Sequence, residues 1–254
     1  MSEISKLQLI DIYKDYALKD GHRFETLHNI SINVNKGEFI SIIGPSGSGK
    51  STLFNLISGI EEPSSGEILL DGQSITNKRG FVSYMPQKDH LLPWKTVLDN
   101  VIIGMEIRGT KKKEARDHAR QYLKIFGLEE FMNEYPFSLS GGMKQRAALL
   151  RTVLLENDVL LLDEPFGALD EMTRMQMQDW LLEIWEQFQH TVLFVTHSID
   201  EALYLSDRVI VFSPRPATVK YQLEIDLPRD RTVSMMTSPQ FMEYKKELLF
   251  QLNK

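Results

Sequence analysis

One stretch of eight residues constrains the fold of this chain more than any other feature. Gly44–Ser51 reads GPSGSGKS, directly after the short apolar and β-branched run Phe39–Ile43. A helical pattern begins at Ser51 and continues to Ser58, with Gly59 as its expected end. The order predicts a strand, a glycine-rich loop and a helix.

The loop suits the binding of a nucleotide phosphate. Glycines let successive backbone N–H groups turn inward around anionic oxygens, and the helix N-terminus adds partial positive charge. Lys50 should reach the β- and γ-phosphates, and the Ser51 hydroxyl should bind Mg²⁺. A chance match in a flexible loop is the alternative, and the flanking strand and helix count against it. The expected nucleotide contacts are Gly44, Pro45, Ser46, Gly47, Ser48, Gly49, Lys50, Ser51 and Thr52.

A second candidate element lies more than a hundred residues further along. The apolar run Val159–Leu162 is followed by the adjacent carboxylates Asp163 and Glu164. Asp163 at the end of a buried strand could hold Mg²⁺, and Glu164 could act as general base toward a water. For an isolated pair, a simple polar turn would be the commoner explanation.

A third element, Leu139–Arg146, reads LSGGMKQR, a Ser/Gly turn just before a helix and therefore a second backbone anion site. One nucleotide does not need two such cradles from one chain. We therefore expect each chain to offer one loop to its own ATP and the other to the ATP of a second copy, across a twofold axis. Ser140 as a helix N-cap is compatible with this interpretation.

The pattern along the chain predicts an α/β fold with an antiparallel β portion near the N-terminus and an inserted helical subdomain at about 90–155. Strands are expected in the first half at Leu7–Ile12, around Ile30–Val34, at Gly66–Leu70 and at Phe81–Tyr84, with a loop around Lys19–Arg23. Helices are expected from Thr96 to Arg108 and at Glu114–Phe126. The second half should alternate through Val159–Leu162, Glu171–Phe188, Thr191–Val195, Ile199–Leu205 and Arg208–Phe212.

These elements predict one domain over residues 1–220, followed by a short extension over 221–254. Within the extension, Ser238 and Pro239 predict the start of a short helix.

Composition narrows the class of protein. The 254 residues carry 29 Lys and Arg against 35 Asp and Glu, a net charge of −6, which gives no broad basic footprint for nucleic acid. The chain has no cysteine, which excludes disulfides and thiolate chemistry. No apolar stretch is long enough to span a bilayer and the N-terminus has no signal-peptide pattern, so we expect a soluble chain whose membrane role depends on a partner.

Together the motifs resemble the nucleotide-binding subunits of ATP-binding cassette (ABC) transporters up to about Phe212, in the order typical of that family. Besides the elements above, the resemblance includes Gln87 in MPQ, Asp170 at the end of ALD, and His197 after a strand. Met143 departs from the commoner LSGGQ signature, in which the serine and the glycine backbone contact phosphate.

The resemblance implies a P-loop ATPase core and a role for each matching residue. Gln87 would bind Mg²⁺ or the attacking water, and His197 would contact the γ-phosphate. Tyr16 would stack on adenine, with Tyr13 as the rival candidate. Ser140, Gly141 and Gly142 would bind the partner's ATP, and Asp170 would communicate between the two ATP sites.

The segments LLPWKTVLDNV, FGALDEMTR and FVTHSIDEAL resemble the importer branch, and more narrowly importers of nitrate, sulfonates, taurine or pyrimidine precursors of thiamine. This implies an ATPase at the cytoplasmic face of the membrane, partnered by permease subunits and indirectly by an extracytoplasmic solute-binding protein. Trp94 would either receive the permease or lie in the core. The rival functions are a soluble cassette ATPase acting on DNA, ribosomes or cluster assembly, and a P-loop kinase.

Overall fold

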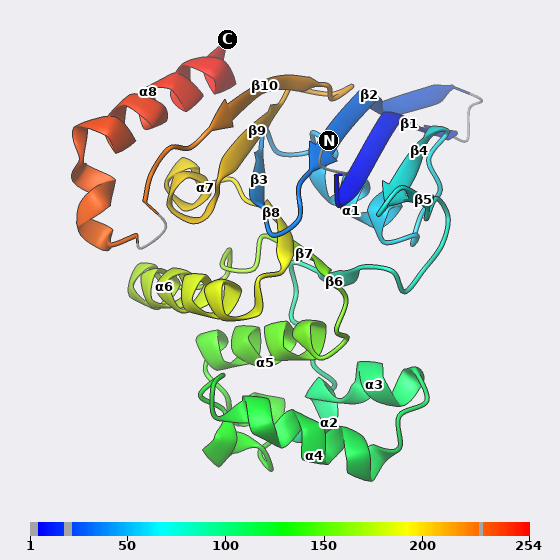
Figure 1. The fold of residues 1–254 in the computed structure, drawn as a ribbon, viewed down its shortest axis with the longest axis vertical. Coiled ribbons are helices and arrows are strands. Elements are labelled where there is room, and N and C mark those ends of the chain that lie inside the picture. The colour runs from blue at the N-terminus through cyan, green and yellow to red at the C-terminus, as the bar shows by residue number, and fades with distance from the viewer. Residues whose placement is uncertain (1–4, 18–21, 229–230) are drawn as a thin grey trace.

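The strand before the glycine-rich loop occupies an inner position of a six-stranded sheet (Figure 1). The structure is a computed structural model, and it describes residues 5–17, 22–228 and 231–254. The order of this sheet is β10-β9-β3-β8-β7-β6; β10 runs antiparallel to β9 and the other neighbours are parallel. The strands are β3 (Phe39–Ile43), β6 (Ser83–Met85), β7 (Val159–Asp163), β8 (Thr191–Val195), β9 (Arg208–Phe212) and β10 (Val219–Glu224).

Helices cover both faces of this sheet, and every residue of β3, β7 and β8 is buried, as expected for parallel strands. Alternate side chains point to opposite faces. Leu161 of β7 packs with α1 (Lys50–Ile57), whereas Leu160 and Leu162 pack toward α5 (Gly141–Val153) and α6 (Glu171–Phe188). The predicted α/β fold is confirmed.

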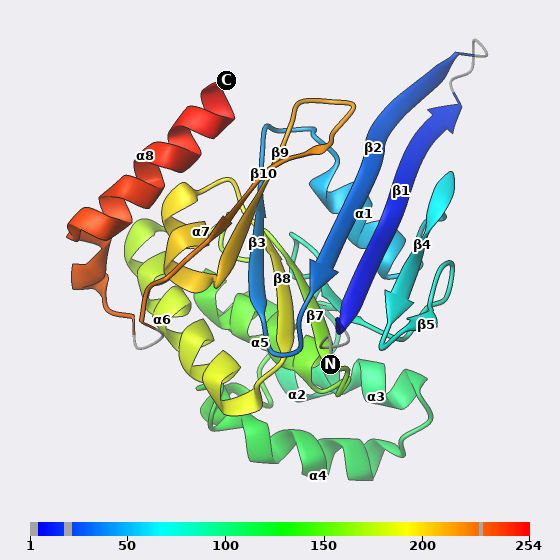
Figure 2. The same ribbon diagram turned by 45° about the horizontal axis from the view of Figure 1, so that its top comes forward.

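A second, antiparallel sheet lies on the other side of α1 (Figure 2). Its order is β2-β1-β4-β5, and its apolar side chains join those of α1 and β3 in one buried cluster. The helix after the glycine-rich loop is thus held between two sheets. The strands are β1 (Leu7–Ala17), β2 (Arg23–Val34), β4 (Ser65–Leu70) and β5 (Gln73–Ser74).

Strand β1 extends five residues beyond the expected end at Ile12, and β2 begins at Arg23, where a loop was expected. Between them, residues 18–21 lie outside the described residues. The register shifts three times along the β1–β2 pair, and Asp11 has a φ of 48°. These bulges interrupt the simple alternation of apolar and polar residues, so the pattern conceals the second half of the strand.

The expected helix from Thr96 to Arg108 is broken at Ile102 into α2 (Val97–Val101) and α3 (Ile103–Ile107). Thr96 does cap the first piece, since its side chain accepts a hydrogen bond from the Asp99 backbone N–H. The break lets Gly104 approach Leu155 so closely that an added Cβ would lie 2.6 Å from the Leu155 Cδ2 atom. The close packing of Gly104 against Leu155, just after α5, therefore stabilises the fold more than an unbroken helix would.

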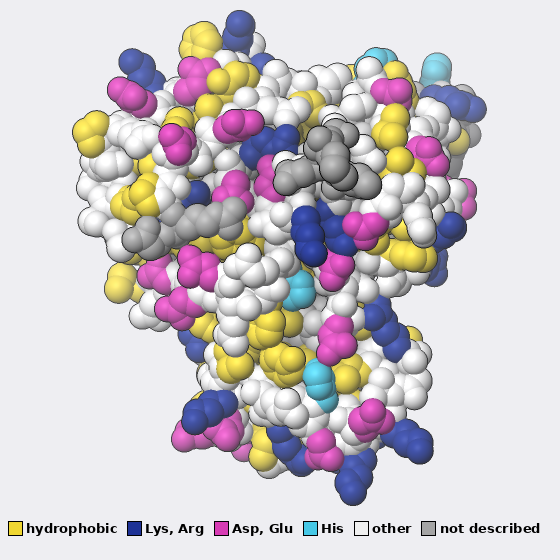
Figure 3. Space-filling model, in the orientation of Figure 1, with side chains coloured by type: hydrophobic (Ala, Val, Ile, Leu, Met, Phe, Trp, Pro, Cys, Tyr) yellow, Lys and Arg dark blue, Asp and Glu magenta, His cyan; other side chains and the backbone are white. Residues whose placement is uncertain are grey.

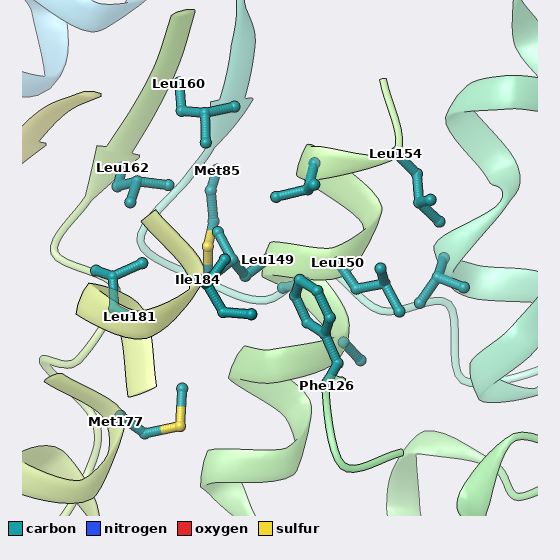
Figure 4. Close-up of a cluster of buried hydrophobic side chains, with 14 of the residues drawn as sticks. Met85, Phe126, Leu149, Leu150, Leu154, Leu160, Leu162, Met177, Leu181 and Ile184 are labelled. Carbon is teal, nitrogen blue, oxygen red and sulfur yellow. The ribbon is translucent and has the colours of Figure 1, made fainter. Parts of the chain in front are cut away.

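The remaining elements of the helical block are α4 (Lys112–Leu123), two short 3₁₀ turns (Glu129–Phe131 and Pro136–Ser138) and α5. Leu149 and Leu150 of α5 meet Met85 of β6, Leu162 of β7 and Leu181 of α6 in a buried apolar cluster (Figure 4). This cluster joins the helical block to the sheet.

The C-terminal part docks on the sheet. The predicted boundary after residue 220 falls inside β10, which pairs with β9. A 3₁₀ turn (Val233–Thr237) then leads into α8 (Pro239–Asn253), which Ser238 caps as predicted and which is longer than the short helix expected. Phe241 and Leu248 of α8 are buried in a cluster with Leu203 of α7 (Ile199–Leu205).

The surface carries both signs of charge. On the face drawn in Figure 3, Lys and Arg side chains alternate with Asp and Glu. Within the described residues, none of the helices has the length and apolar character needed to cross a membrane.

Candidate active site

The glycine-rich loop connects β3 to α1 and needs its glycines for different reasons. Gly49, the residue before α1, has a φ of 94°, and an added Cβ would lie 2.8 Å from Leu27 Cδ2 and 2.9 Å from Thr26 Cγ2. Gly47 has a φ of 75°, a conformation that side chains disfavour. The sequence at these two positions therefore fixes the shape of the loop.

Lys50 is the first residue of α1, and its side chain turns back along the loop. It is only 7% exposed, and its Nζ atom donates to the carbonyl oxygens of Gly44 (2.9 Å) and Pro45 (3.0 Å). Burial lowers the pKa of this ammonium group, and the nearby charges of Glu164 and Asp163 oppose that effect. Lys50 is thus a positioned cation inside the loop.

Asp163 ends β7 and lies beside the loop. Its carboxylate is 4% exposed, so burial raises its pKa, while hydrogen bonds from Ser51 and Tyr84 favour the charged form. The Tyr84 hydroxyl lies 3.3 Å from Asp163 Oδ2, and burial together with this carboxylate raises the pKa of Tyr84. The Asp163 carboxylate is therefore held by Tyr84 and lies beside Ser51 of the loop.

Glu164, the next residue, contacts two further residues that the sequence predicts for the site, Gln87 and His197. Gln87 Nε2 donates to Glu164 Oε2 at 2.9 Å, and His197 Nδ1 lies 3.5 Å from the same oxygen. Glu164 has a φ of 44°, and its backbone N–H donates to the Val195 carbonyl of β8 at 2.9 Å. The strained backbone aims the carboxylate between β6 and β8, where Gln87 and His197 follow their strands.

A cavity of about 410 Å³ joins the loop to Glu164, Gln87 and His197 at the carboxyl ends of the parallel strands, and Asp163 does not line it. Its wall includes all the expected loop residues except Pro45, together with both residues that contact Glu164. The lining consists of Gly44, Ser46, Gly47, Ser48, Gly49, Lys50, Ser51, Thr52, Gln87, Glu164, His197 and Arg215.

The oxygen donors beside the cavity fit a magnesium ion. The Ser51 hydroxyl and the Asp163 carboxylate lie close to each other, and hard oxygen ligands of this kind suit Mg²⁺. Among the described residues, no group of three or more His, Asp or Glu side chains forms a metal cage.

Ser140, Gly141 and Gly142 do not line this cavity. Ser140 is exposed and caps α5, accepting a hydrogen bond from the Met143 backbone N–H at 3.3 Å. An added Cβ at Gly142 would lie 2.9 Å from Thr173 Cγ2, so the start of α5 packs on the first turn of α6. Thr173 in turn is hydrogen-bonded to Asp170, the N-cap of α6, and these bonds lower the pKa of Asp170.

The two candidate aromatic residues for adenine differ in their surroundings. The Tyr13 ring meets His28 edge to face, with centroids 5.0 Å apart. The Tyr16 hydroxyl donates to Glu61, and burial raises the pKa of Tyr16. Tyr16 also lies beside the Thr52 side chain, which lines the cavity, whereas neither tyrosine lines it directly.

Arg215 and Tyr84 are site residues that the sequence did not reveal. Arg215 donates to the Gly47 carbonyl and stacks over the Phe24 ring, 4.5 Å from its centroid. An arginine between two prolines at a strand end was its only signal. Tyr84 occupies an ordinary strand position, so nothing distinguished it.

Trp94 lies on the surface with 71% of its area exposed, so the alternative that it is a core residue is wrong. Exposed aromatic residues also follow α4: Phe137 is 78% exposed, and its ring stacks parallel to Tyr135 with centroids 5.8 Å apart. The chain after Trp94 is linked to this region, because the Val97 N–H donates to the Glu134 carbonyl at 2.8 Å.

Comparison with known proteins identifies what this arrangement is similar to. Residues 27–167 match the family model described as ABC transporter. The nitrate import ATP-binding protein NrtD of Synechocystis sp. is 41% identical over 95% of this chain and 93% of its own length. The aliphatic sulfonates import ATP-binding protein SsuB of Bacillus cereus is 42% identical over 96% of this chain and 95% of its own length.

A solved structure extends the likeness to three dimensions. It is described as the dimeric structure of a post-hydrolysis state of the ATP-binding cassette MJ0796 bound to ADP and Pi. It matches with a TM-score of 0.76 and 31% identity, covering 87% of this chain and all of that one.

Proposed function

Because this chain belongs to the ABC transporter family and is an ABC-type ATPase, we propose that it is the subunit whose ATP hydrolysis powers a membrane importer. One observation carries the proposed catalytic roles. Lys50, Glu164, Gln87 and His197 come from four separate segments of the chain and line one cavity at the sheet edge.

In this proposal the loop from Gly44 to Thr52 binds the ATP phosphates and Lys50 neutralises the β- and γ-phosphates. Ser51, Asp163 and Gln87 would hold Mg²⁺, which when bound neutralises charge on the phosphate oxygens. Tyr16 would contact adenine at the end of the site next to Thr52. The rate acceleration then rests on positioning and charge stabilisation.

Glu164 is proposed as the general base. Its Oε2 atom already accepts a hydrogen bond from Gln87 and faces His197, so a water between them and the γ-phosphate would be oriented and polarised. His197 would stabilise the γ-phosphate as the oxygen–phosphorus bond breaks.

The complete site requires a second copy of the chain. Ser140 and Gly141 are exposed at the start of α5, and neither they nor Gly142 line the chain's own cavity, which supports binding of this turn to the partner's ATP. Asp170 lies at the next turn along the same surface and would sense the neighbouring site.

The exposed apolar surface around Trp94 is proposed to receive the permease, at the cytoplasmic face of the membrane. The buried apolar cluster around Leu149 and Leu150 of α5 attaches the helical block to the sheet. Through this rigid attachment, motion at the ATP site would be transmitted to the surface around Trp94. The names of the relatives support a small solute such as nitrate or a sulfonate. The sequence resemblance adds a pyrimidine precursor as the third candidate, and an extracytoplasmic binding protein would deliver the solute.

Affinity capture tests this function. Tagged Glu164→Gln chain with ATP should recover a multi-span permease from detergent-solubilised membranes of its native cells, identified by mass spectrometry. The Lys50→Ala variant is the matched control, since it should not form the ATP-bound dimer. If only ribosomal, DNA-binding or cluster-assembly proteins are recovered, the chain is a soluble cassette ATPase and not part of a transporter. If a captured protein is phosphorylated in the presence of ATP, the chain is a kinase.

A further inference from the structure

A buried carboxylate lies one turn beyond His197, outside the cavity. Glu201, in the first turn of α7, is 6% exposed. Its Oε2 atom accepts a hydrogen bond from the Thr196 hydroxyl, and its Oε1 atom accepts one from Gln178 Nε2 of α6 at 3.2 Å. The nearest cation, Arg174 Nε of α6, lies 3.7 Å from Oε1.

Glu201 forms hydrogen bonds with the residues on both sides of His197 in the turn. The Thr196 hydroxyl accepts a hydrogen bond from the Ser198 backbone N–H at 3.0 Å, so it fixes the residues on both sides of His197. The Ser198 hydroxyl in turn accepts from the Glu201 backbone N–H at 3.3 Å. The exposed imidazole thus extends toward Glu164 from a backbone that Glu201 holds at two points.

The same carboxylate reaches toward the Asp170 turn through Arg174. Arg174 Nη2 donates to the Leu169 carbonyl at 3.0 Å, one residue before Asp170. Helices α6 and α7 lie side by side (Figure 1), and the contacts of Glu201 with Gln178 and Arg174 link them. One network therefore spans the two turns to which the proposed function gives separate roles.

Stability alone does not account for a charge at this position. Burial raises the pKa of Glu201, whereas Thr196, Arg174, His197 and Gln178 favour the charged form. A buried ion with one partner at 3.7 Å gains little free energy of folding compared with a well-packed apolar residue. Directional acceptors, however, can hold a turn in one orientation.

We propose that Glu201 is a positioning residue for His197, and that Arg174 extends the same constraint to the Asp170 turn. The inference rests on the role proposed above for His197. Glu201 does not contact the cavity, so its effect on hydrolysis must act through the orientation of the His197 turn.

The test compares Glu201→Gln with Asp200→Asn in the full-length chain. Asp200 is the adjacent acid on the same helix, but it pairs with Lys245 of α8 at 2.7 Å, away from the network. We expect Glu201→Gln to lower kcat by roughly 10- to 100-fold, as misplacement of a reacting group does, with KM for ATP and ATP affinity changed less than about twofold. Asp200→Asn should retain the parent kcat.

A double variant separates positioning from general damage. His197→Ala combined with Glu201→Gln should be no slower than His197→Ala alone, because the second change acts through the first residue. Losses that multiply, or a Glu201→Gln kcat equal to that of Asp200→Asn, would overturn the inference. If His197→Ala itself hydrolyses ATP at the parent rate, the proposed function of His197 fails instead.

Arg174→Gln tests the second half of the network. Combined with Glu201→Gln, it should lower kcat less than the product of the two single effects. Independent effects would remove Arg174 from the proposal.

A second pair of variants covers the case in which Glu201→Gln does not fold. Thr196→Val removes the hydroxyl and keeps the volume, whereas Thr196→Ser keeps the hydroxyl. We expect kcat to fall in the valine variant and to be largely retained in the serine variant, at melting temperatures within a few degrees of the parent. Equal kcat values for the two variants would contradict a positioning role.

Discussion

Lys50 is a buried cation whose hydrogen-bond acceptors are backbone carbonyls of its own loop. Carbonyls are weaker partners for an ammonium group than phosphate oxygens, because a phosphate oxygen adds Coulomb attraction between two opposite charges. The side chain therefore has a partner before nucleotide arrives, and in the proposed function it would gain a better one afterwards.

We expect Lys50→Ala to weaken Mg·ATP binding by about 10- to 100-fold, since a hydrogen bond to a charged group contributes about 1.5–3 kcal/mol. Isothermal titration calorimetry measures this directly. Lys36→Ala, which removes an exposed lysine from the turn before β3, should bind as the parent does. Parent-like affinity of Lys50→Ala would remove Lys50 from the site.

Glu164→Gln keeps the size and the hydrogen-bonding reach of the side chain but removes the proposed general base. Steady-state ATP hydrolysis should fall by about 10²- to 10⁴-fold, the usual contribution of general acid–base catalysis, while ATP binding persists. Release of phosphate measured with saturating ATP checks the rate, with Glu62→Gln, an exposed acid, as the control. Hydrolysis at the parent rate would exclude Glu164 as general base.

Among the candidate site residues, those that belong to local motifs could be predicted from the sequence. Those that reach the site only through tertiary packing became visible in the structure. The residues of the glycine-rich loop are consecutive in the sequence, and so are Asp163 and Glu164. The chemistry of each motif can therefore be inferred from its residue types and spacing. Arg215 reaches Gly47 across 168 residues, and no local pattern encodes that approach.

The elements of the helical block are connected by a charge cluster as well as by apolar packing. Asp99, in the first turn of α2, is hydrogen-bonded through both carboxylate oxygens by Arg116 of α4, and Lys112 lies 3.2 Å away. Partial burial favours the neutral acid, but Arg116 and Lys112 outweigh it and lower the pKa of Asp99. The carboxylate therefore attaches α4 to α2.

Asp99→Asn should lower the free energy of unfolding by about 1 kcal/mol at neutral pH, since both cations that pair with Asp99 are partly exposed. Because the folded pKa lies below the unfolded value of about 3.9, this stabilisation is present above that pH and is lost as the pH falls through the folded pKa. Urea unfolding at pH 7 and pH 3 should show the difference shrinking in acid. A constant difference across that range would contradict the ion-pair assignment.

Element boundaries followed the sequence where local signals agree with packing. Helix α6, strand β8, helix α7 and strand β9 occupy the predicted ranges, because caps and apolar runs mark both of their ends. The second half of strand β1 and the α2–α3 break were missed for one physical reason. Bulges and the approach of Gly104 to Leu155 are set by neighbours distant in sequence.

At the scale of the whole molecule, the proposed function has the two anion sites of one chain bind different ATP molecules. With ATP and Mg²⁺, the Glu164→Gln chain should therefore elute with twice its 29.3 kDa mass, measured by light scattering. Adding Ser140→Arg should return it to the monomer mass, because a large side chain would fill the position facing the partner's nucleotide. Dimers that persist in this double variant would argue against the head-to-tail arrangement.

The α1 helix, buried between two sheets, has a consequence for the thermodynamics of binding. Both ends of the phosphate loop are anchored in packed elements, so the loop loses little conformational entropy when nucleotide enters. Most of the interaction free energy is then expressed as affinity rather than used to order the protein. By the same logic, amide hydrogens of β3 and α1 should exchange with solvent slowly whether or not nucleotide is bound.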